Sequence, residues 1–182
     1  MTADLIAPRG LKGLVVAETS VGDVRGDEGF YHYRQYDATE LARLRSVEDV
    51  WALLIDGALP EPGDTTFSAE VRSLRELPEA ALAVIDTLAA LPGDLMTRLS
   101  AAVLAVAATD GVVPSLDQTT SERRRCGLRL AALVPVILAR LWRVGRGEEP
   151  IPPASDLGHA AILLWMVNGV RPTADATRLI ET

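Results

Sequence analysis

The side chains that most often carry acid–base and metal chemistry are scarce in this sequence of 182 residues. It contains two histidines, His32 and His159, which lie far apart and belong to no metal-ligand spacing. His32 alternates with Tyr31 and Tyr33, which is typical of a surface position on a hairpin strand. His159 lies within LGHAAILLWM, a context that favours a hydrogen-bonded histidine on a helix. Residue types and spacing alone therefore predict no catalytic residue and no metal site.

The one cysteine, Cys126, follows three arginines in the stretch RRRCGLRLAAL. These arginines, residues 123–125, could activate the thiol or bind a phosphate. The favoured interpretation is a small core residue for Cys126 and a solvated helix start, beside Glu122, for the arginines. The Gly-x-Gly pair at residues 145–147 follows a helix instead of a strand, so it is no dinucleotide-binding loop.

Charge and hydropathy exclude several classes of function. The net charge of −7 and the isoelectric point of about 4.9 disfavour binding along a nucleic-acid backbone. The most apolar segment, residues 128–142, is too short to cross a bilayer and contains two arginines and a proline. A single cysteine allows no internal disulfide, and the first twenty residues show no signal-peptide pattern. We therefore expect a cytoplasmic protein with no membrane or nucleic-acid partner.

The elements that would position these side chains are mostly helices. Two short strands, 14–25 and 29–34, are expected around a turn at 26–29, where glycines permit unusual backbone angles. Helical periodicity begins after Asp37, and a helix capped by Ser46 is expected to stop at Gly57. Further helices are expected over 66–76, 79–91, 94–109, 120–145 with a kink at Pro135, about 156–168, and from Thr173 onward.

The opening stretch RGLKGLVVAETSVGDVRGDEGFYHYRQYDATELARLRSVEDVWALLIDGALP resembles the N-terminal region of citrate synthases. The family's glycine turn is matched at residues 10–13, its apolar strand at 15–19 and its Asp-Gly turn at 26–29. Its Arg-Gly-Tyr-Asp-type segment is matched at 34–37, and its Gly-x-Leu-Pro helix end at 57–60. A second match begins at RLAALVPVILARLWRVGRGEEPIPPASD and continues to TADATR, so the resemblance covers nearly the whole chain in order.

This resemblance implies a mainly α fold, a helical citrate synthase-like large-domain portion with a small N-terminal β-hairpin. We divide the chain into residues 1–36, the turn and hairpin, and residues 37–182, the helical part. Members of the family condense acetyl-CoA, or propionyl-CoA in methylcitrate synthases, with oxaloacetate and are usually homodimers. The coenzyme A thioester is a substrate, and the resemblance implies no permanently bound cofactor.

The resemblance also implies which residues are missing. In the family an aspartate takes a proton from the thioester methyl group, one histidine stabilises the enol and another polarises the oxaloacetate carbonyl, while arginines hold the carboxylates. All of these lie beyond the family segment that this sequence matches, and His32 and His159 match none of them. One ligand residue is carried over: Arg9 stands immediately before the glycine turn, where some members use an arginine to bind the phosphates of coenzyme A.

The sequence departs from the family pattern at a few positions. Gln35 replaces the usual glycine of the Arg-Gly-Tyr-Asp segment, so that turn is expected to differ. Asp94, Leu95 and Ser100 stand where histidine, proline and arginine are usual. These departures indicate a divergent paralogue.

Two interpretations follow, and a third, an unrelated helical interaction module, leaves the ordered match unexplained. The chain is either the N-terminal half of a citrate synthase-type enzyme, inactive by itself, or a naturally short subunit that binds or regulates a synthase. A half-enzyme should leave apolar helix faces exposed and self-associate, and we expect those faces at 128–141 and 160–167.

Overall fold

The computed structural model describes residues 6–11, 13–15 and 17–181 of the chain. Within these residues the chain forms eight α-helices and one small antiparallel sheet, as the composition and the resemblance predict. The helices are α1 (Ala38–Leu44), α2 (Val47–Asp56), α3 (Thr66–Ser73), α4 (Glu79–Ala89), α5 (Leu95–Thr109), α6 (Thr120–Val144), α7 (His159–Asn168) and α8 (Ala174–Glu181). The strands are β1 (Gly22–Arg25), β2 (Phe30–Tyr33) and β3 (Tyr36–Asp37), and short 3-10 turns are formed by Arg9–Leu11, Gly26–Glu28 and Ser115–Asp117.

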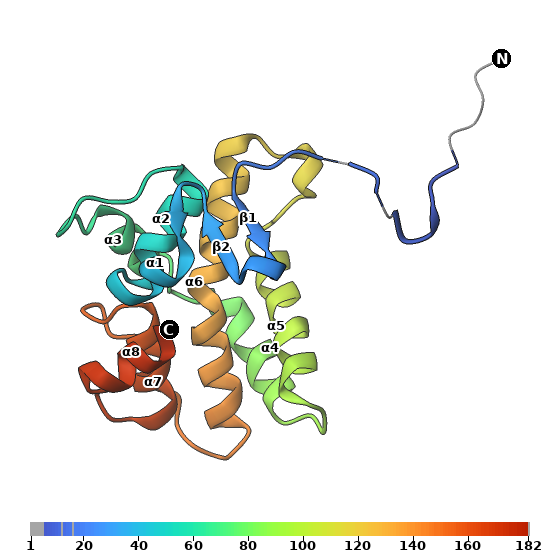
Figure 1. Cartoon of the computed structure of the whole chain (residues 1–182). Helices are drawn as coiled ribbons and strands as arrows, with labels where there is room; N and C mark the ends of the chain where they lie inside the picture. Colours follow the sequence, from blue (N-terminus) through green and yellow to red (C-terminus); the bar gives the residue numbers. More distant parts are fainter. Residues whose placement is uncertain (1–5, 12, 16, 182) are drawn as a thin grey trace.

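The hairpin is shorter than the sequence predicts. β1 pairs with β2 from Gly22 opposite Tyr33 to Arg25 opposite Phe30, and Gly29 closes the predicted turn with φ of 63°. The expected strand over 14–25 is wrong before Gly22: the described residues of 14–21 have no strand partner in the described part of the chain. Together with the described residues from 6 onward they form an N-terminal arm that leaves the body of the molecule (Figure 1) and is exposed throughout.

Local caps set the helix ends, and those at Ser46 and Gly57 were predicted. Ser46 and Asp49 form a reciprocal capping box at the start of α2, and Gly57 ends that helix in the left-handed conformation with φ of 89°. Asp37 caps α1 by accepting the backbone N–H groups of Thr39 and Glu40. Three boundaries differ from expectation by two residues or more: α3 ends at Ser73 instead of 76, α4 ends at Ala89 instead of 91, and α7 begins at His159 instead of about 156.

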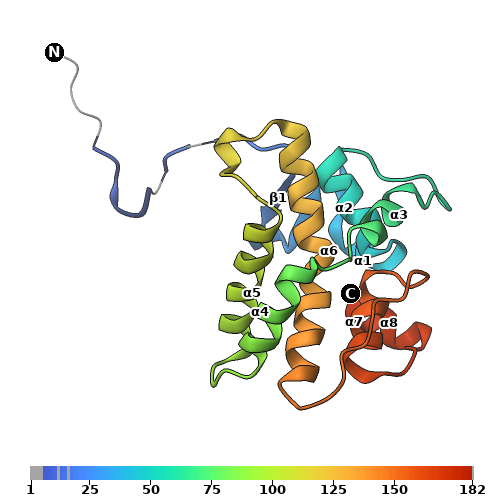
Figure 2. The same ribbon diagram turned by 180° about the vertical axis from the view of Figure 1, so that it is seen from behind.

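The long helix α6 is the centre of the fold. It runs between the α4–α5 pair on one side and the α7–α8 pair on the other (Figures 1 and 2). Against α4 and α5 it buries a wholly aliphatic core in which Ile85, Val106, Leu133 and Ile137 are fully inaccessible to solvent. Pro135 lies inside α6 and is buried, and the helix is continuous through it. No helix in the described residues is long and apolar enough to cross a membrane.

The expectation that 128–141 and 160–167 leave apolar faces exposed is wrong. Every residue in both segments is buried or only partly exposed. The reason is tertiary: α6 is covered by α3, α4, α5 and α7 at different heights, and α7 packs into its own cluster around Val136, Ala139, Ile162 and Met166. Large apolar side chains are exposed at other places, among them the N-terminal arm, α5, α8 and the Ser115–Asp117 turn.

Candidate functional site

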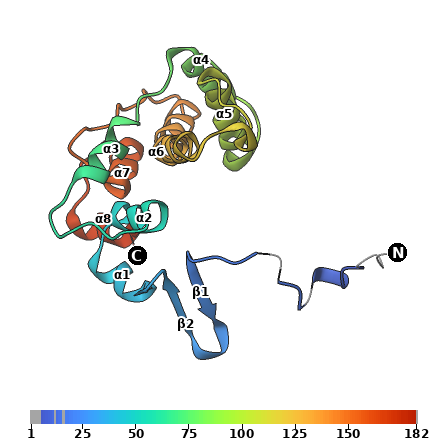
Figure 3. The same ribbon diagram turned by 90° about the horizontal axis from the view of Figure 1, so that it is seen from above.

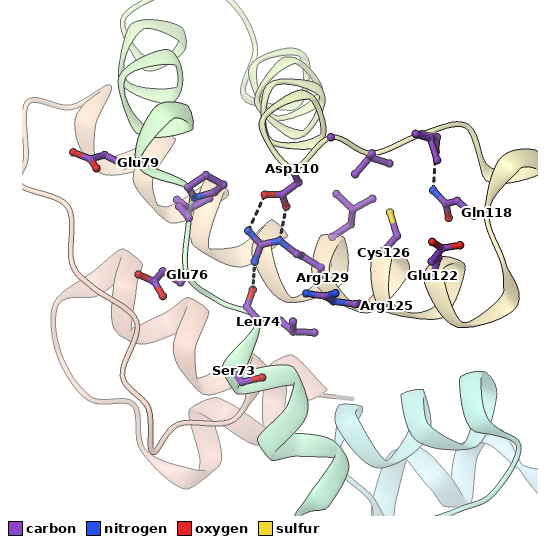
Figure 4. Close-up of a pocket in the computed structure, with 16 residues that line it drawn as sticks. Ser73, Leu74, Glu76, Glu79, Asp110, Gln118, Glu122, Arg125, Cys126 and Arg129 are labelled. Carbon is purple, nitrogen blue, oxygen red and sulfur yellow. Dashed lines mark hydrogen bonds and ion pairs between the residues drawn. The ribbon is translucent and has the colours of Figure 1, made fainter.

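A groove with a volume of about 700 Å³ lies beside the first turns of α6. Figure 4 shows its walls, which come from α6, the connection after α5 and the Ser73–Glu79 segment between α3 and α4. Asp110, at the end of α5, is bound through both carboxylate oxygens by Arg129 of α6. Arg129 also donates to the carbonyl of Leu74, so it fixes the three walls relative to each other.

The groove brings Arg125 and Cys126 together but gives them no catalytic partner. Arg125 is exposed, Cys126 is half-buried, and Glu122 is engaged in the capping box of α6 with Thr119. Neither histidine lines the groove. The described residues contain no cluster of three or more histidine, cysteine or acidic side chains that could hold a metal ion. Without a base beside the thiol, the groove offers a solvent-open surface between packed elements and no activated nucleophile.

The arginines before Cys126 divide between different tasks. Arg124 forms bidentate hydrogen bonds with Asp56 of α2 and also pairs with Glu70 of α3, at 2.5 to 2.9 Å. These bonds hold the pKa of both carboxyls below the usual range. Arg123 donates to the carbonyls of Ser115 and Gln118, which closes the loop that precedes α6. Arg123 and Arg124 therefore tie helices and loops together, while Arg125 is an exposed residue in the wall of the groove.

A buried polar cluster, defined as Glu48, Arg75 and His159, was not predicted from the sequence. Glu48 and Arg75 are each only 3% exposed. The Oε1 atom of Glu48 accepts the backbone N–H of His159 at 2.6 Å, so α2 supplies the N-terminal cap of α7 across 111 residues. Arg75 donates to the carbonyl of Leu157 at 2.7 Å and lies 3.9 Å from Glu48.

His159 is held as a neutral structural residue in this cluster. Its ring packs edge-on against Trp51, with 4.5 Å between the ring centroids. Burial first, and then the charge of Arg75, lower the pKa of His159 to about 4. Its Nδ1 atom is buried with no hydrogen-bond partner in the described residues. The side-chain hydrogen bond expected for this histidine is therefore absent there; its backbone N–H is the bonded group.

The other predicted positions are placed as follows. His32 lies on β2 opposite Asp23 and Asp37, with its ring 5.5 Å from that of Phe30, as a hairpin residue. Arg9 lies in the exposed 3-10 turn Arg9–Leu11 of the N-terminal arm. That position leaves its guanidinium open to solvent, and nothing in the structure tests its binding of a phosphate.

The departures from the family pattern have local structural effects. Asp94 caps α5, since its carboxylate accepts the N–H of Thr97 at 2.9 Å. Ser100 is exposed and donates back to the carbonyl of Met96. The two-residue turn at Gln35 places its neighbour Arg34 at φ of 50°, and the Arg34 side chain donates to the carbonyls of Leu53 and Leu54 at the end of α2.

Comparison with known proteins gives a consistent result. A family model described as "Citrate synthase, C-terminal domain" matches residues 10–182. The chain is 37% identical to the citrate synthase of Haloferax volcanii over 90% of its own length and 44% of that protein. It is 28% identical to the citrate/2-methylcitrate synthase of Bacillus subtilis over 91% of its length and 44% of that protein.

Solved structures agree. The citrate synthase of Pyrobaculum aerophilum matches with a TM-score of 0.79 and 33% identity, over 93% of this chain and 44% of that one. The citrate synthase of Thermotoga maritima matches with a TM-score of 0.78 and 26% identity, over 95% of this chain and 44% of that one. The chain thus spans less than half the length of the relatives it matches.

Proposed function

Because the chain belongs to the citrate synthase family, we propose that it is the N-terminal half of an acyltransferase that condenses acetyl-CoA with oxaloacetate to form citrate. The observation that carries this proposal is the match of 93% of the chain to the citrate synthase structure of Pyrobaculum aerophilum at a TM-score of 0.79. The assignment to the N-terminal half rests on the glycine turn and hairpin at the beginning of the chain, which resemble the family's opening segment.

The chemistry of the described residues supports inactivity of this chain by itself. Proton abstraction from a thioester methyl group needs a carboxylate or an imidazole beside the substrate. The His159 ring is buried against Trp51, and the His32 ring lies on the hairpin beside Phe30. Of the acids that line the groove, Asp110 is bound by Arg129 and Glu122 by the cap of α6 at one end, while Glu76 and Glu79 stand at the other end, where no histidine lines the groove to stabilise an enol (Figure 4).

The proposal is tested by complementation. Residues 1–182 are mixed with the part of the Haloferax volcanii citrate synthase that this chain does not match, and thiol release from acetyl-CoA is followed with oxaloacetate present. We expect no turnover by either piece alone and oxaloacetate-dependent thiol release by the mixture. Citrate formation by residues 1–182 alone would overturn the proposed inactivity. If the two pieces form a complex that releases no thiol, the enzyme assignment is overturned.

A second function, a short non-catalytic subunit that binds or regulates a synthase, is favoured by one observation. The segments 128–141 and 160–167 are covered within this chain, so its core is closed without the rest of a synthase. If this function is correct, the chain binds an intact citrate synthase and changes its rate. It then restores no thiol release when it is mixed with the unmatched part of the Haloferax volcanii enzyme.

Arg9 is the residue we propose for coenzyme A phosphates, with the complete enzyme as a cytoplasmic homodimer. A charged hydrogen bond of this kind contributes about 1.5 to 3 kcal/mol. Arg9→Ala should therefore weaken coenzyme A binding, measured by calorimetry, by roughly ten- to a hundredfold. Arg43→Ala, an exposed arginine on α1, is the control and should leave the affinity unchanged. Equal affinities for the wild-type chain and Arg9→Ala would remove Arg9 from the site.

A further inference from the structure

A second groove, with a volume of about 610 Å³, lies between the segment that follows α3 and the second half of α6. Figure 3 shows this segment passing along α6 on its way from α3 to α4. The Pro150–Ser155 segment and Met166 of α7 complete the walls. Ser73, Glu76 and Leu77 line both this groove and the one described above.

The charge of this second groove is opposite to that of the whole chain. Among the described residues that line it, arginines outnumber acids, with Arg72, Arg75 and Arg140 against Glu76. The complete chain, in contrast, has a net charge of −7. Arg140 is already paired with both carboxylate oxygens of Asp86, at 2.6 and 2.7 Å. The other two arginines are therefore the ones available to a ligand.

Arg75 is buried with unused hydrogen-bond donors. It is 3% exposed, and its Nη1 atom donates to the carbonyl of Leu157 at 2.7 Å. Its Nε and Nη2 atoms have no hydrogen-bond partner among the described residues. Nη2 lies 3.9 Å from the Oε1 atom of Glu48, which already accepts the backbone N–H of His159. A buried cation with unused donors is destabilising, so an anion that reaches this side chain is favoured.

Arg72, three residues before Arg75, adds a second cation. It is partly exposed, and its guanidinium forms no hydrogen bond or ion pair with the described residues. Burial lowers the pKa of Arg75, and the charge of Arg72 lowers it further against the opposing effect of Glu48. The two guanidinium groups therefore repel each other, and an anion held by both compensates for that repulsion.

The remaining walls of the groove are largely aliphatic. Apolar side chains come from α4, α6, α7 and the two connecting segments: Leu77, Leu82, Val136, Ile151 and Met166. None of the described lining residues is aromatic, so the groove lacks the stacking surface that favours a nucleotide base. A planar carboxylate accepts two parallel N–H bonds from a guanidinium, and aliphatic walls suit a carbon chain behind it.

We propose that this second groove binds an aliphatic carboxylate, with the carboxylate held by Arg72 and Arg75 and the carbon chain on the apolar walls. The inference goes beyond the proposed function and does not rest on it. The described lining contains no histidine and no cysteine, so the proposal is one of binding and not of reaction. A bound ligand contacts the segment after α3, α6 and the Pro150–Ser155 segment together, and so stabilises the fold.

The test uses hexanoate as the probe and measures binding without activity. Residues 1–182 are titrated at neutral pH and constant ionic strength, and NMR follows the Nε–H signals of Arg72 and Arg75. Hexanol keeps the carbon chain without the charge, acetate keeps the carboxylate without the chain, and inorganic phosphate is a different anion. Arg72→Gln removes one cation from a partly exposed position. Arg43→Gln, at an exposed position on α1, is the control with the same change in net charge.

We expect saturable binding of hexanoate, a shift of the Arg75 Nε–H signal and a higher unfolding temperature with the ligand present. Arg72→Gln should unfold like the wild type without ligand and bind hexanoate about tenfold more weakly, whereas Arg43→Gln should bind it normally. No saturable binding by the wild type, equal binding of hexanol, or an unchanged affinity in Arg72→Gln would each overturn the proposal. An equal loss in Arg43→Gln would also overturn it. Acetate or phosphate binding as tightly as hexanoate would overturn the aliphatic ligand and assign the groove to small anions.

Discussion

The two sides of α6 are built from different kinds of contact. On the α4–α5 side the contact is aliphatic and closed, with Ile85, Leu133 and Ile137 fully buried. On the other side, where α7 and α8 meet α1 and α2, a buried glutamate and a buried arginine face a neutral histidine. The first region is stabilised mainly by apolar burial, with an ion pair between Arg140 of α6 and Asp86 of α4 and a hydrogen bond from Arg98 to Ala89. The second depends on each polar atom finding its partner.

Arginines carry much of the second kind of contact. The last carbonyls of a helix have no partner within the helix. In this chain Arg34, Arg143 and Arg178 donate to such carbonyls at the ends of α2, α7 and α1. The planar guanidinium donates to two acceptors in a fixed geometry, whereas the ammonium of lysine is a point charge on a flexible stem. The polar region therefore depends on residue identity more strongly than the aliphatic core does.

The largest effect is expected from Glu48→Ala. The substitution leaves Arg75 buried without its carboxylate and removes the cap from the first N–H of α7. Breaking a buried pair by removing one partner costs about 3 to 5 kcal/mol. Urea unfolding followed by circular dichroism measures the change. Glu48→Gln keeps the acceptor oxygen and should lose less stability. An equal loss of stability in Glu48→Ala and Glu48→Gln would assign the effect to packing.

In the aliphatic region Leu133→Ala should lower the free energy of unfolding by about 2 to 5 kcal/mol, which is similar to or slightly less than the effect of Glu48→Ala. The substitution leaves a cavity in a closed core. The conservative Ile137→Val should cost about 1 kcal/mol. If Ile137→Val lowers the free energy of unfolding as much as Glu48→Ala does, the two regions do not differ as described. Urea unfolding followed by circular dichroism measures both variants.

The regions should also differ in their response to pH. The folded-state pKa of His159 is about 4, below the 6.5 of the unfolded chain, so the unfolded state binds more protons between these values. Stability contributed by neutral His159 is complete above pH 6.5 and is lost as the pH falls toward 4. The loss from pH 7 to pH 5 should be about 2 kcal/mol. His159→Phe should flatten this dependence, and a slope unchanged in that variant would contradict the assignment.

A smaller effect is expected from Arg178→Lys. Lysine cannot bind the carbonyls of Ala42 and Arg45 in the same fork, and the loss of one such hydrogen bond costs about 1 kcal/mol. Hydrogen exchange should speed up in α8 and remain unchanged in α5. Uniform faster exchange in both helices would show that α8 is not a separate unit.

The smallest effect is expected at the end of a single helix. Asp94→Ala removes the cap of α5 and should cost about 1 kcal/mol, while Asp94→Asn, which keeps an acceptor, should cost less. Thermal unfolding measures both. Equal stability of the alanine variant and the wild type would mean that Thr97 finds another acceptor.

The sequence by itself determined the features that depend on neighbours along the chain. The cap at Ser46 and the stop at Gly57 were predicted because a cap bonds within three residues and a left-handed end needs glycine. The family and the mainly helical fold were also predictable, from motifs in order over the chain. The strand before Gly22 was not, since the apolar run that begins at Leu14 indicates a strand whether or not a partner is present.

Only the tertiary structure decided which faces are covered and which charges are buried. Nothing local marks Glu48 as different from the other acids in first turns of helices, because its partner His159 lies 111 residues away. The same holds for α8, where the pattern of Leu179 and Ile180 predicts an amphipathic helix but not that Arg178 turns inward. Helical periodicity identifies an apolar side, and the direction in which that side points is fixed by the helices that pack against it.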